Sequence, residues 1–203
     1  MNPLILLLCL LLNFGISWWN AWSAGRFWTE VKIIKGWPRV LVWASVVMSA
    51  VGFTWVYLTI LTIGATALEY LTPDQASVMF NLGYLILIPA LLTSGTVIWV
   101  HSIINAWKKR QFGDIAVAGW NTYAQARNIW SAAKHTPGAF QSVTDFFLGG
   151  SKSNKRRSSK DSAAGFLIIL LVILAIGGGA LTTAAIVKNA DKKYVLEVTS
   201  TFD

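Results

Sequence analysis

The chain has 203 residues, of which 55% are hydrophobic and 13% charged, and its mean hydropathy is +0.54. These values exclude an ordinary water-soluble domain, in which about a quarter of the residues are charged. The formal net charge of +8 would suggest a nucleic-acid partner in a soluble protein, but no folded nucleic-acid reader is recognisable and no nucleic acid is expected here. Cys9 is the only cysteine, which excludes an intramolecular disulfide and a thiolate metal cluster.

Four long stretches contain no Asp, Glu, Lys or Arg. They are residues 1–25, 40–68, 75–107 and 162–187. A helix needs about 20 apolar residues to cross about 30 Å of hydrocarbon, so each stretch is long enough. The sequence therefore predicts an all-α integral membrane protein with four transmembrane helices in a bundle.

The first predicted span covers about residues 3–22. A cleaved secretory signal peptide is the competing interpretation, with cleavage after Ser23. Against cleavage, no Lys or Arg precedes the apolar run. Cleavage would also leave the basic residues from Arg26 to Arg39 outside, which conflicts with the charge rule. An uncleaved first span is favoured, and removal of residues 1–23 stays open.

The second and third spans are predicted at about residues 40–63 and 77–101. Gly36-Trp37-Pro38 is a turn signal, and Pro38 suits the first turn of the second helix. Thr72-Pro73-Asp74-Gln75 is the pattern of a capping box, which predicts that the third helix begins at about Pro73. Pro89 predicts a kink in that helix. The third helix is predicted to extend past the membrane to Trp107. Residues 1–107, with the first three helices, are therefore predicted to form the first membrane unit.

Residues 108–148 are predicted to form a helical segment at the membrane interface. In this segment Trp120, Tyr123, Arg127, Trp130 and Lys134 recur at steps of three and four, so they share one helical face. Rings at headgroup depth, with Arg127 and Lys134 reaching toward phosphates, are typical of an interfacial amphipathic helix on an anionic bilayer. The helix is predicted to end at residues 136–138, Thr-Pro-Gly, with a second short amphipathic turn following.

The remainder of the chain is predicted in three parts. Residues 149–165 are rich in Ser, Lys and Arg and predict a disordered basic linker. Residues 166–188 form the fourth span. The tail, residues 189–203, carries a weak alternation at 194–199 that predicts a short strand.

Basic residues are distributed unevenly among the connections. The interval 102–165 holds ten of them, the first connection holds four, and the second holds none. The positive-inside rule then predicts a cell-membrane protein with both termini extracytoplasmic and residues 102–165 cytoplasmic. The ten are Lys108, Lys109, Arg110, Arg127, Lys134, Lys152, Lys155, Arg156, Arg157 and Lys160.

Small and polar residues form a stripe on each predicted span. Membrane helices associate through close packing and hydrogen bonds, so these residues predict the helix–helix contacts. The alternative is a polar pathway for a solute, for which Asn13 is the best candidate. The predicted packing residues are Asn13, Ser45, Ser49, Gly52, Gly83, Ser94 and Gly179.

No catalytic motif is recognisable: there is no HExxH, no Gly-rich phosphate loop and no GxSxG. No cofactor or metal is expected, because His101 and His135 have no carboxylate at ligand spacing. The sequence favours a non-catalytic subunit that scaffolds or anchors other membrane proteins, or copies of itself, through its basic and aromatic inner face. The alternative is an oligomeric pore or channel component. A membrane-embedded enzyme acting on lipid is the third hypothesis.

Overall fold

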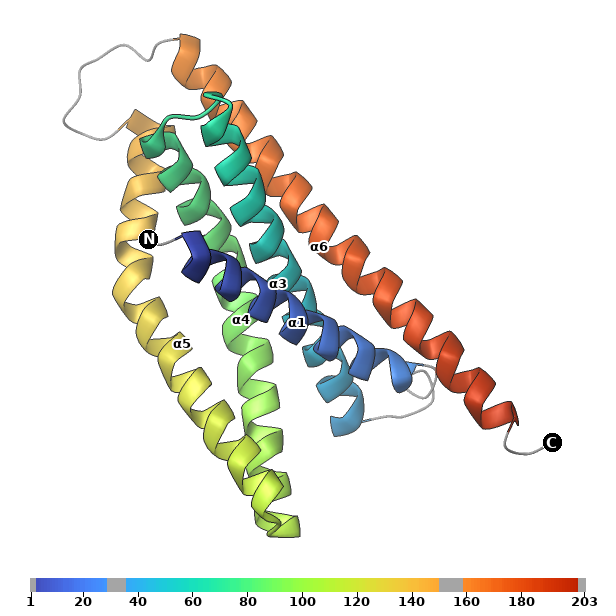
Figure 1. The fold of residues 1–203 in the computed structure, drawn as a ribbon. Helices are drawn as coiled ribbons and strands as arrows, with labels where there is room; N and C mark the ends of the chain where they lie inside the picture. Colours follow the sequence, from blue (N-terminus) through green and yellow to red (C-terminus); the bar gives the residue numbers. More distant parts are fainter. Residues whose placement is uncertain (1–2, 29–35, 150–158, 201–203) are drawn as a thin grey trace.

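The computed structural model describes residues 3–28, 36–149 and 159–200 (Figure 1). Within these ranges the regular secondary structure is entirely helical: α1 (Pro3–Arg26), α3 (Trp37–Ala67), α4 (Pro73–Lys109), α5 (Phe112–Thr144), the π-helical turn η1 (Asp145–Gly149) and α6 (Ser159–Ser200). Four helices are long and apolar enough to cross a membrane, namely α1, α3, α4 and the Ser162–Asp191 part of α6. The predicted all-helical character is therefore confirmed within these ranges, and the four helices are consistent with a multi-pass membrane protein.

The predicted start of the third helix is confirmed in detail. The backbone N–H of Gln75 donates to Oγ1 of Thr72 at 3.3 Å, and the backbone N–H of Thr72 donates to Oε1 of Gln75 at 3.0 Å. Two donors that the first helical turn leaves without partners are thereby satisfied, with Pro73 opening the helix. Pro38 likewise lies in the first turn of α3.

The prediction of a helix end at residues 136–138 is wrong. Helix α5 continues through Pro137 to Thr144, and the short amphipathic turn predicted beyond it is instead the end of α5 followed by η1. A proline removes one backbone donor, but packing outweighs that loss here, because Ala139 just beyond it is only 4% exposed.

Two predictions about the last third of the chain are also wrong. Helix α6 begins at Ser159, so residues 159–165 of the predicted disordered linker are helical. Residues 194–199, predicted as a strand, belong to the same helix, because their weak alternation is overridden by continuation of the helix. Residues 150–158 of the predicted linker lie outside the described residues.

Helix α3 lies at the centre and contacts α1, α4 and α6, while α5 packs along α4 (Figure 1). Helix α5 runs antiparallel to α4 and returns to the end of the molecule where α3 joins α4. We call this the α3–α4 end; it also holds η1 and the start of α6. The opposite end, where α4 joins α5, is the α4–α5 end; α1 and α6 run toward it.

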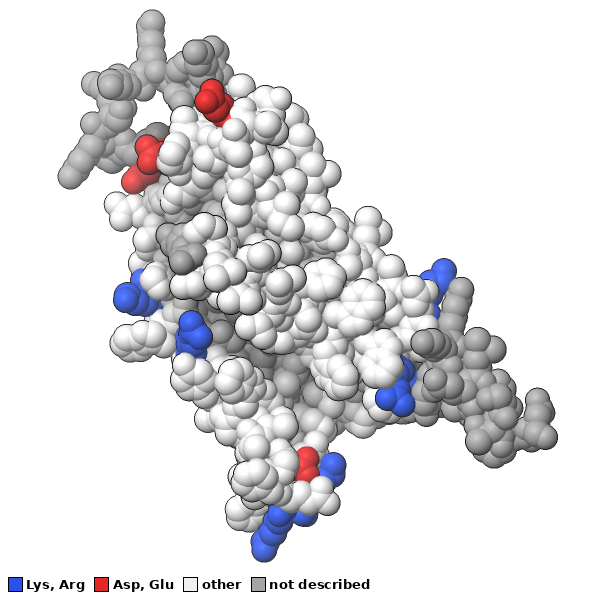
Figure 2. Space-filling model, in the orientation of Figure 1, with Lys and Arg blue, Asp and Glu red and all other residues white. Residues whose placement is uncertain are grey.

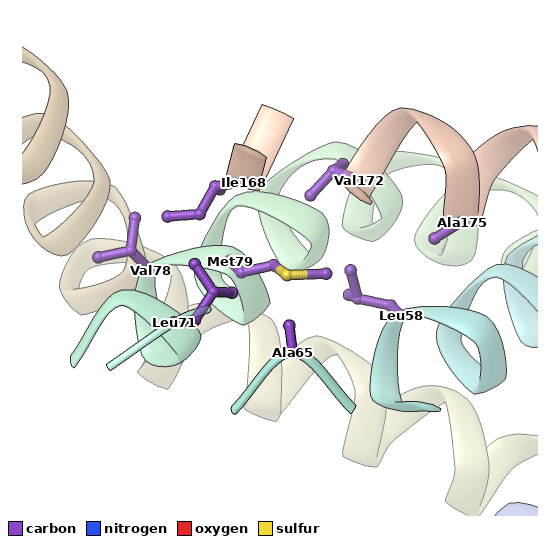
Figure 3. Close-up of a cluster of buried hydrophobic side chains, with 8 residues drawn as sticks. All are labelled: Leu58, Ala65, Leu71, Val78, Met79, Ile168, Val172 and Ala175. Atoms are coloured by element: carbon purple, nitrogen blue, oxygen red, sulfur yellow. The ribbon is translucent and has the colours of Figure 1, made fainter. Parts of the chain in front are cut away.

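The main apolar cluster lies near the α3–α4 end and joins three helices (Figure 3). Met79 of α4 is fully buried, and its side chain lies among Leu58 of α3, Leu71 of the connection and Val172 of α6. Burial from lipid brings little hydrophobic gain, so the cluster stabilises the fold through close dispersion contacts. Its members are Leu58, Ala65, Leu71, Val78, Met79, Ile168, Val172 and Ala175.

Candidate functional site

Ser49 joins three helices. Its side chain is fully buried, and its Oγ donates to the backbone carbonyl of Ser17 in α1 at 2.8 Å. The same Oγ lies 3.2 Å from Oγ1 of Thr183 in α6. Because a hydroxyl has one proton, Ser49 donates to α1 and accepts from Thr183. This predicted packing residue therefore ties α3 to both α1 and α6.

The predicted glycines lie where helices approach closely. A Cβ at Gly52 would collide with the Ser17 side chain, one at Gly83 with Leu58, and one at Gly179 with the side chain and backbone of Thr54. In addition, Nδ2 of Asn13 donates to the carbonyl of Gly52 at 3.2 Å. Small residues at these points allow the backbones to approach, as membrane helix packing requires.

The two remaining predicted packing residues satisfy their hydroxyls within their own helices. Ser45 Oγ donates to the carbonyl of Leu41 at 3.1 Å, and Ser94 Oγ donates to that of Ala90. Ser94 is buried, with its Oγ 3.9 Å from the sulfur of Met48. Ser45 therefore makes no hydrogen bond to another helix within the described part of the chain, although it shares the stripe with Ser49.

The polar side of α5 faces α4. Gln125 is 3% exposed, and its Nε2 donates to Oγ1 of Thr96 at 2.9 Å and to the carbonyl of Leu92 at 3.2 Å. Trp99 Nε1 donates to Oγ1 of Thr122 at 2.9 Å. These bonds, with one more from Tyr84 OH to the carbonyl of Ser131 at 3.3 Å, fix the antiparallel register of the two helices. We call this set of contacts the α4–α5 seam.

The aromatic side of α5 faces away from the bundle. Trp120, Tyr123 and Trp130, which we call the aromatic row, are 66%, 60% and 72% exposed. The rings of Trp120 and Tyr123 contact each other, with centroids 6.2 Å apart. The three side chains that the sequence placed on one face are thus all exposed, and each buries its apolar ring only in part.

The predicted basic residues divide between two places. Lys108, Lys109 and Arg110 lie at the α4–α5 end, whereas Arg127 and Lys134 belong to the middle of α5; Figure 2 shows basic side chains both at that end and partway along the molecule. Lys109 Nζ lies 4.0 Å from Oδ1 of Asp114, and the Arg110 guanidinium lies 5.9 Å from the ring centroid of Trp107. Both contacts are exposed and contribute little to stability.

His101 links α3 to α4 near the α4–α5 end. Trp37 Nε1 donates to Nδ1 of His101 at 3.1 Å, and the Asn105 amide lies 2.9 Å from Nε2. An indole N–H only donates, so Nδ1 carries the lone pair and Nε2 carries the proton. The neighbour of Nε2 is Nδ2 of Asn105, so this tautomer pairs with Asn105 when the amide is turned to bring its oxygen to Nε2. Both ring nitrogens of His101 thus have hydrogen-bonding neighbours within the protein, whereas His135 is exposed on α5.

Sequence reasoning did not identify the residues of the α4–α5 seam or the position of Arg127. Arg127 and Asn128 line a groove shared by α1, α3, α4 and α5, and Asn13 lines it from α1. One signal was present in the sequence: Asn121, Gln125, Asn128 and Ser131 form a polar side opposite the aromatic row. That signal does not say which side faces protein.

Within the described ranges, no group of three or more His, Cys, Asp and Glu side chains is placed to hold a metal ion. The polar clusters there consist of amides, hydroxyls and indoles that hydrogen-bond one helix to another. Comparison with protein-family models, with curated proteins and with solved structures gave no match to this chain. Function must therefore be argued from the geometry alone.

Proposed function

We propose that this chain is a non-catalytic membrane subunit that binds another membrane protein through the aromatic row of α5. The observation that carries this proposal is the orientation of α5. Gln125 and Thr122 hydrogen-bond to α4, while Trp120, Tyr123 and Trp130 stay exposed. Large rigid rings of this kind are the residues that dominate protein interfaces.

The same orientation supports placing α5 inside the bilayer, beside α4. The seam contacts α4 between Tyr84 and Trp99, which lies within the predicted third span, residues 77–101. In water a helix buries its aromatic side, whereas in lipid its polar groups must find partners within the protein. Along the α4–α5 seam helix α5 has the second arrangement, while Arg127, Lys134 and His135 are exposed outside the seam. It would then be a fifth crossing rather than the interfacial helix predicted from the sequence.

Five crossings place the two termini on opposite sides. Among the described residues, the α4–α5 end and the helix ends that run toward it carry Arg26, Arg39, Lys108, Lys109, Arg110 and Lys188. For these residues the positive-inside rule favours a cytoplasmic location for that end, whereas the five basic residues from Lys152 to Lys160, in the interval that joins η1 to α6, count toward the opposite end. The N-terminus would then be extracytoplasmic, as predicted, and the C-terminus cytoplasmic.

An oligomeric pore is the second candidate, and the hydrogen bonds give it less support. Ser49 and Thr183 bond to each other between helices, and Thr59 and Thr62 donate to carbonyls of their own helix. Hydroxyls used in this way contribute to packing and leave few groups to line a path. The third candidate, an enzyme acting on lipid, would need a nucleophile beside a base, and the described ranges contain no such cluster.

Photo-crosslinking in native membranes tests the scaffold proposal. A photoreactive phenylalanine analogue replaces Trp130, and the matched control carries it at Ile173 of α6, which is 59% exposed. We expect a discrete protein adduct from position 130 and only lipid adducts from position 173. Lipid adducts alone at both positions would contradict the proposal. An adduct at twice the mass of the chain would favour the oligomeric alternative.

A further inference from the structure

An open groove of about 630 Å³ lies between α1 and α5, with α3 and α4 forming its floor. Polar residues from all four helices line it: Asn13, Ser17 and Asn20 of α1, Thr59 of α3, Tyr84 of α4, and Arg127 and Asn128 of α5. Most of the other lining residues are apolar side chains from α1, α3 and α4. The groove therefore offers a cation and several amides beside hydrocarbon-like walls.

Among the residues that the structure describes, Arg127 is the only charged one that lines this groove. Within the described part of the chain, no hydrogen bond or ion pair joins its guanidinium to another side chain. The α4 residues that share the groove with it are Tyr84, Leu87, Ile88 and Leu91, and the last three lie at the centre of the predicted third span. A charge at that depth of a bilayer costs about 2.5–3.5 kcal/mol or more, so an anion beside Arg127 would be strongly favoured.

We infer that the groove binds an anionic amphiphile, a phosphate or carboxylate headgroup carried on hydrocarbon chains. The guanidinium of Arg127 pairs with the anion, and its fork of donors suits two oxygens at once. The amides of Asn13, Asn20 and Asn128 lie in the same groove and can bond polar atoms of the headgroup, while the chains lie along the leucine and isoleucine side chains. The volume is in the range of about 300–1,000 Å³ that small-ligand sites occupy.

A lipid suits this groove because its headgroup can pair with Arg127 while its acyl chains lie on the apolar lining and continue into the surrounding bilayer. A single cation beside apolar walls is the lining that an anionic amphiphile requires. Binding at Arg127 requires the membrane placement of α5 proposed above, but it does not require a partner on the aromatic row.

Lipid retention by the purified full-length chain in mild detergent tests this inference. Native mass spectrometry counts bound phosphatidylglycerol, with phosphatidylcholine of the same acyl chains as the neutral probe and inorganic phosphate as the headgroup-only probe. We expect retention of phosphatidylglycerol over phosphatidylcholine. The loss of a charge-assisted hydrogen bond should weaken it at least about tenfold in Arg127→Gln. Arg127→Lys should keep the preference, and Lys134→Gln, exposed on the same helix outside the groove, should match the wild type.

Four results would overturn the inference. Equal retention of the two lipids by the wild-type chain would remove the anion requirement, and this result needs no variant to fold. Unchanged phosphatidylglycerol binding by a monodisperse Arg127→Gln variant would remove Arg127 from the site. A photocrosslinker at Asn20 that captures a protein rather than lipid would assign the groove to a protein partner. Inorganic phosphate that stabilises the chain as much as the lipid does would remove the hydrocarbon requirement. Because lipid retention and the Trp130 crosslink are separate readouts, failure of one leaves the other to be judged independently.

Discussion

Gln125 Nε2 lies 2.9 Å from Oγ1 of Thr96, and Gln125 is buried where α5 meets α4 in this contact. It lies in the middle of the α4–α5 seam and opposite Gly95, where a Cβ would collide with the Gln125 amide. The absence of a side chain at Gly95 allows α5 to approach α4 closely enough for the amide to reach. This polar contact turns the Gln125 side of α5 toward the bundle, and the aromatic row on the other side is therefore exposed.

Replacing Gln125 by Leu should loosen the seam. The variant loses two hydrogen bonds to α4, each contributing about 0.5–1.5 kcal/mol. We expect a lower midpoint in detergent unfolding and faster proteolysis within α5. Gln141→Leu, on the same helix but exposed, is the matched control and should leave both measurements unchanged. Equal effects of the two substitutions would mean that the seam does not hold α5 in place.

Ser49→Ala should destabilise the bundle more than Ser45→Ala. Ser49 bonds to α1 and α6, whereas Ser45 bonds only to the carbonyl of its own helix. Interhelical hydrogen bonds in membrane proteins average about 0.6 kcal/mol, so we expect a loss of about 1 kcal/mol for Ser49→Ala and almost none for Ser45→Ala. Unfolding in mixed micelles measures the difference. A larger effect at Ser45 would show that the three-helix junction is misassigned.

Gly179→Leu and Gly177→Leu form a second matched pair. A side chain at Gly179 collides with Thr54 of α3, whereas nothing lies within 4 Å of a Cβ at Gly177. Overpacking at the first position should cost about 1–3 kcal/mol, and the second should be tolerated. Thermal unfolding in detergent distinguishes them. If the Gly179 variant melts as the wild type does, α3 and α6 do not pack through this glycine.

Acidification should break the Trp37–His101 hydrogen bond. A protonated imidazole donates from both nitrogens, so Nδ1 can no longer accept from the indole. The bond, and the stability that it contributes to the α3–α4 contact, should be present while His101 is neutral and lost as the ring takes up a proton. The indole N–H resonance of Trp37, assigned by its loss in Trp37→Phe, should therefore shift as pH falls. His101→Gln should abolish the shift and His135→Gln should not; the reverse pattern would contradict the contact.

The sequence predicts the four long apolar helices and the capping box well because both depend on local patterns. Thr72 and Gln75 are three residues apart, and apolar length alone identifies the spans. Pro137 gave a wrong helix end because the proline signal is local while the packing of α5 on α4 comes from residues far along the chain. Ser45 and Ser49 lie on the same stripe, so the sequence pattern could not tell which of them bonds to another helix. The partner of a hydroxyl depends on which helix faces it.

The orientation of α5 could not be predicted for a related reason. Periodicity places Trp120, Tyr123 and Trp130 on one face and Gln125 on another, but the choice of which face meets protein depends on the surrounding solvent. The groove beside Arg127 was also beyond local patterns. Asn13 and Arg127 both line it, although they lie 114 positions apart in the chain (127 − 13).

Site-directed labelling at the two ends of α5 tests its placement across the membrane most directly. In a Cys9→Ala background, single cysteines replace Gln111, just before α5, and Leu148, in η1 and 81% exposed. Both are probed with a membrane-impermeant maleimide in right-side-out and inverted vesicles. We expect the two positions to react from opposite sides, Gln111 from the cytoplasmic one. Reaction of both from the same side would contradict the fifth crossing and restore the cytoplasmic placement of residues 102–165 that the sequence predicts.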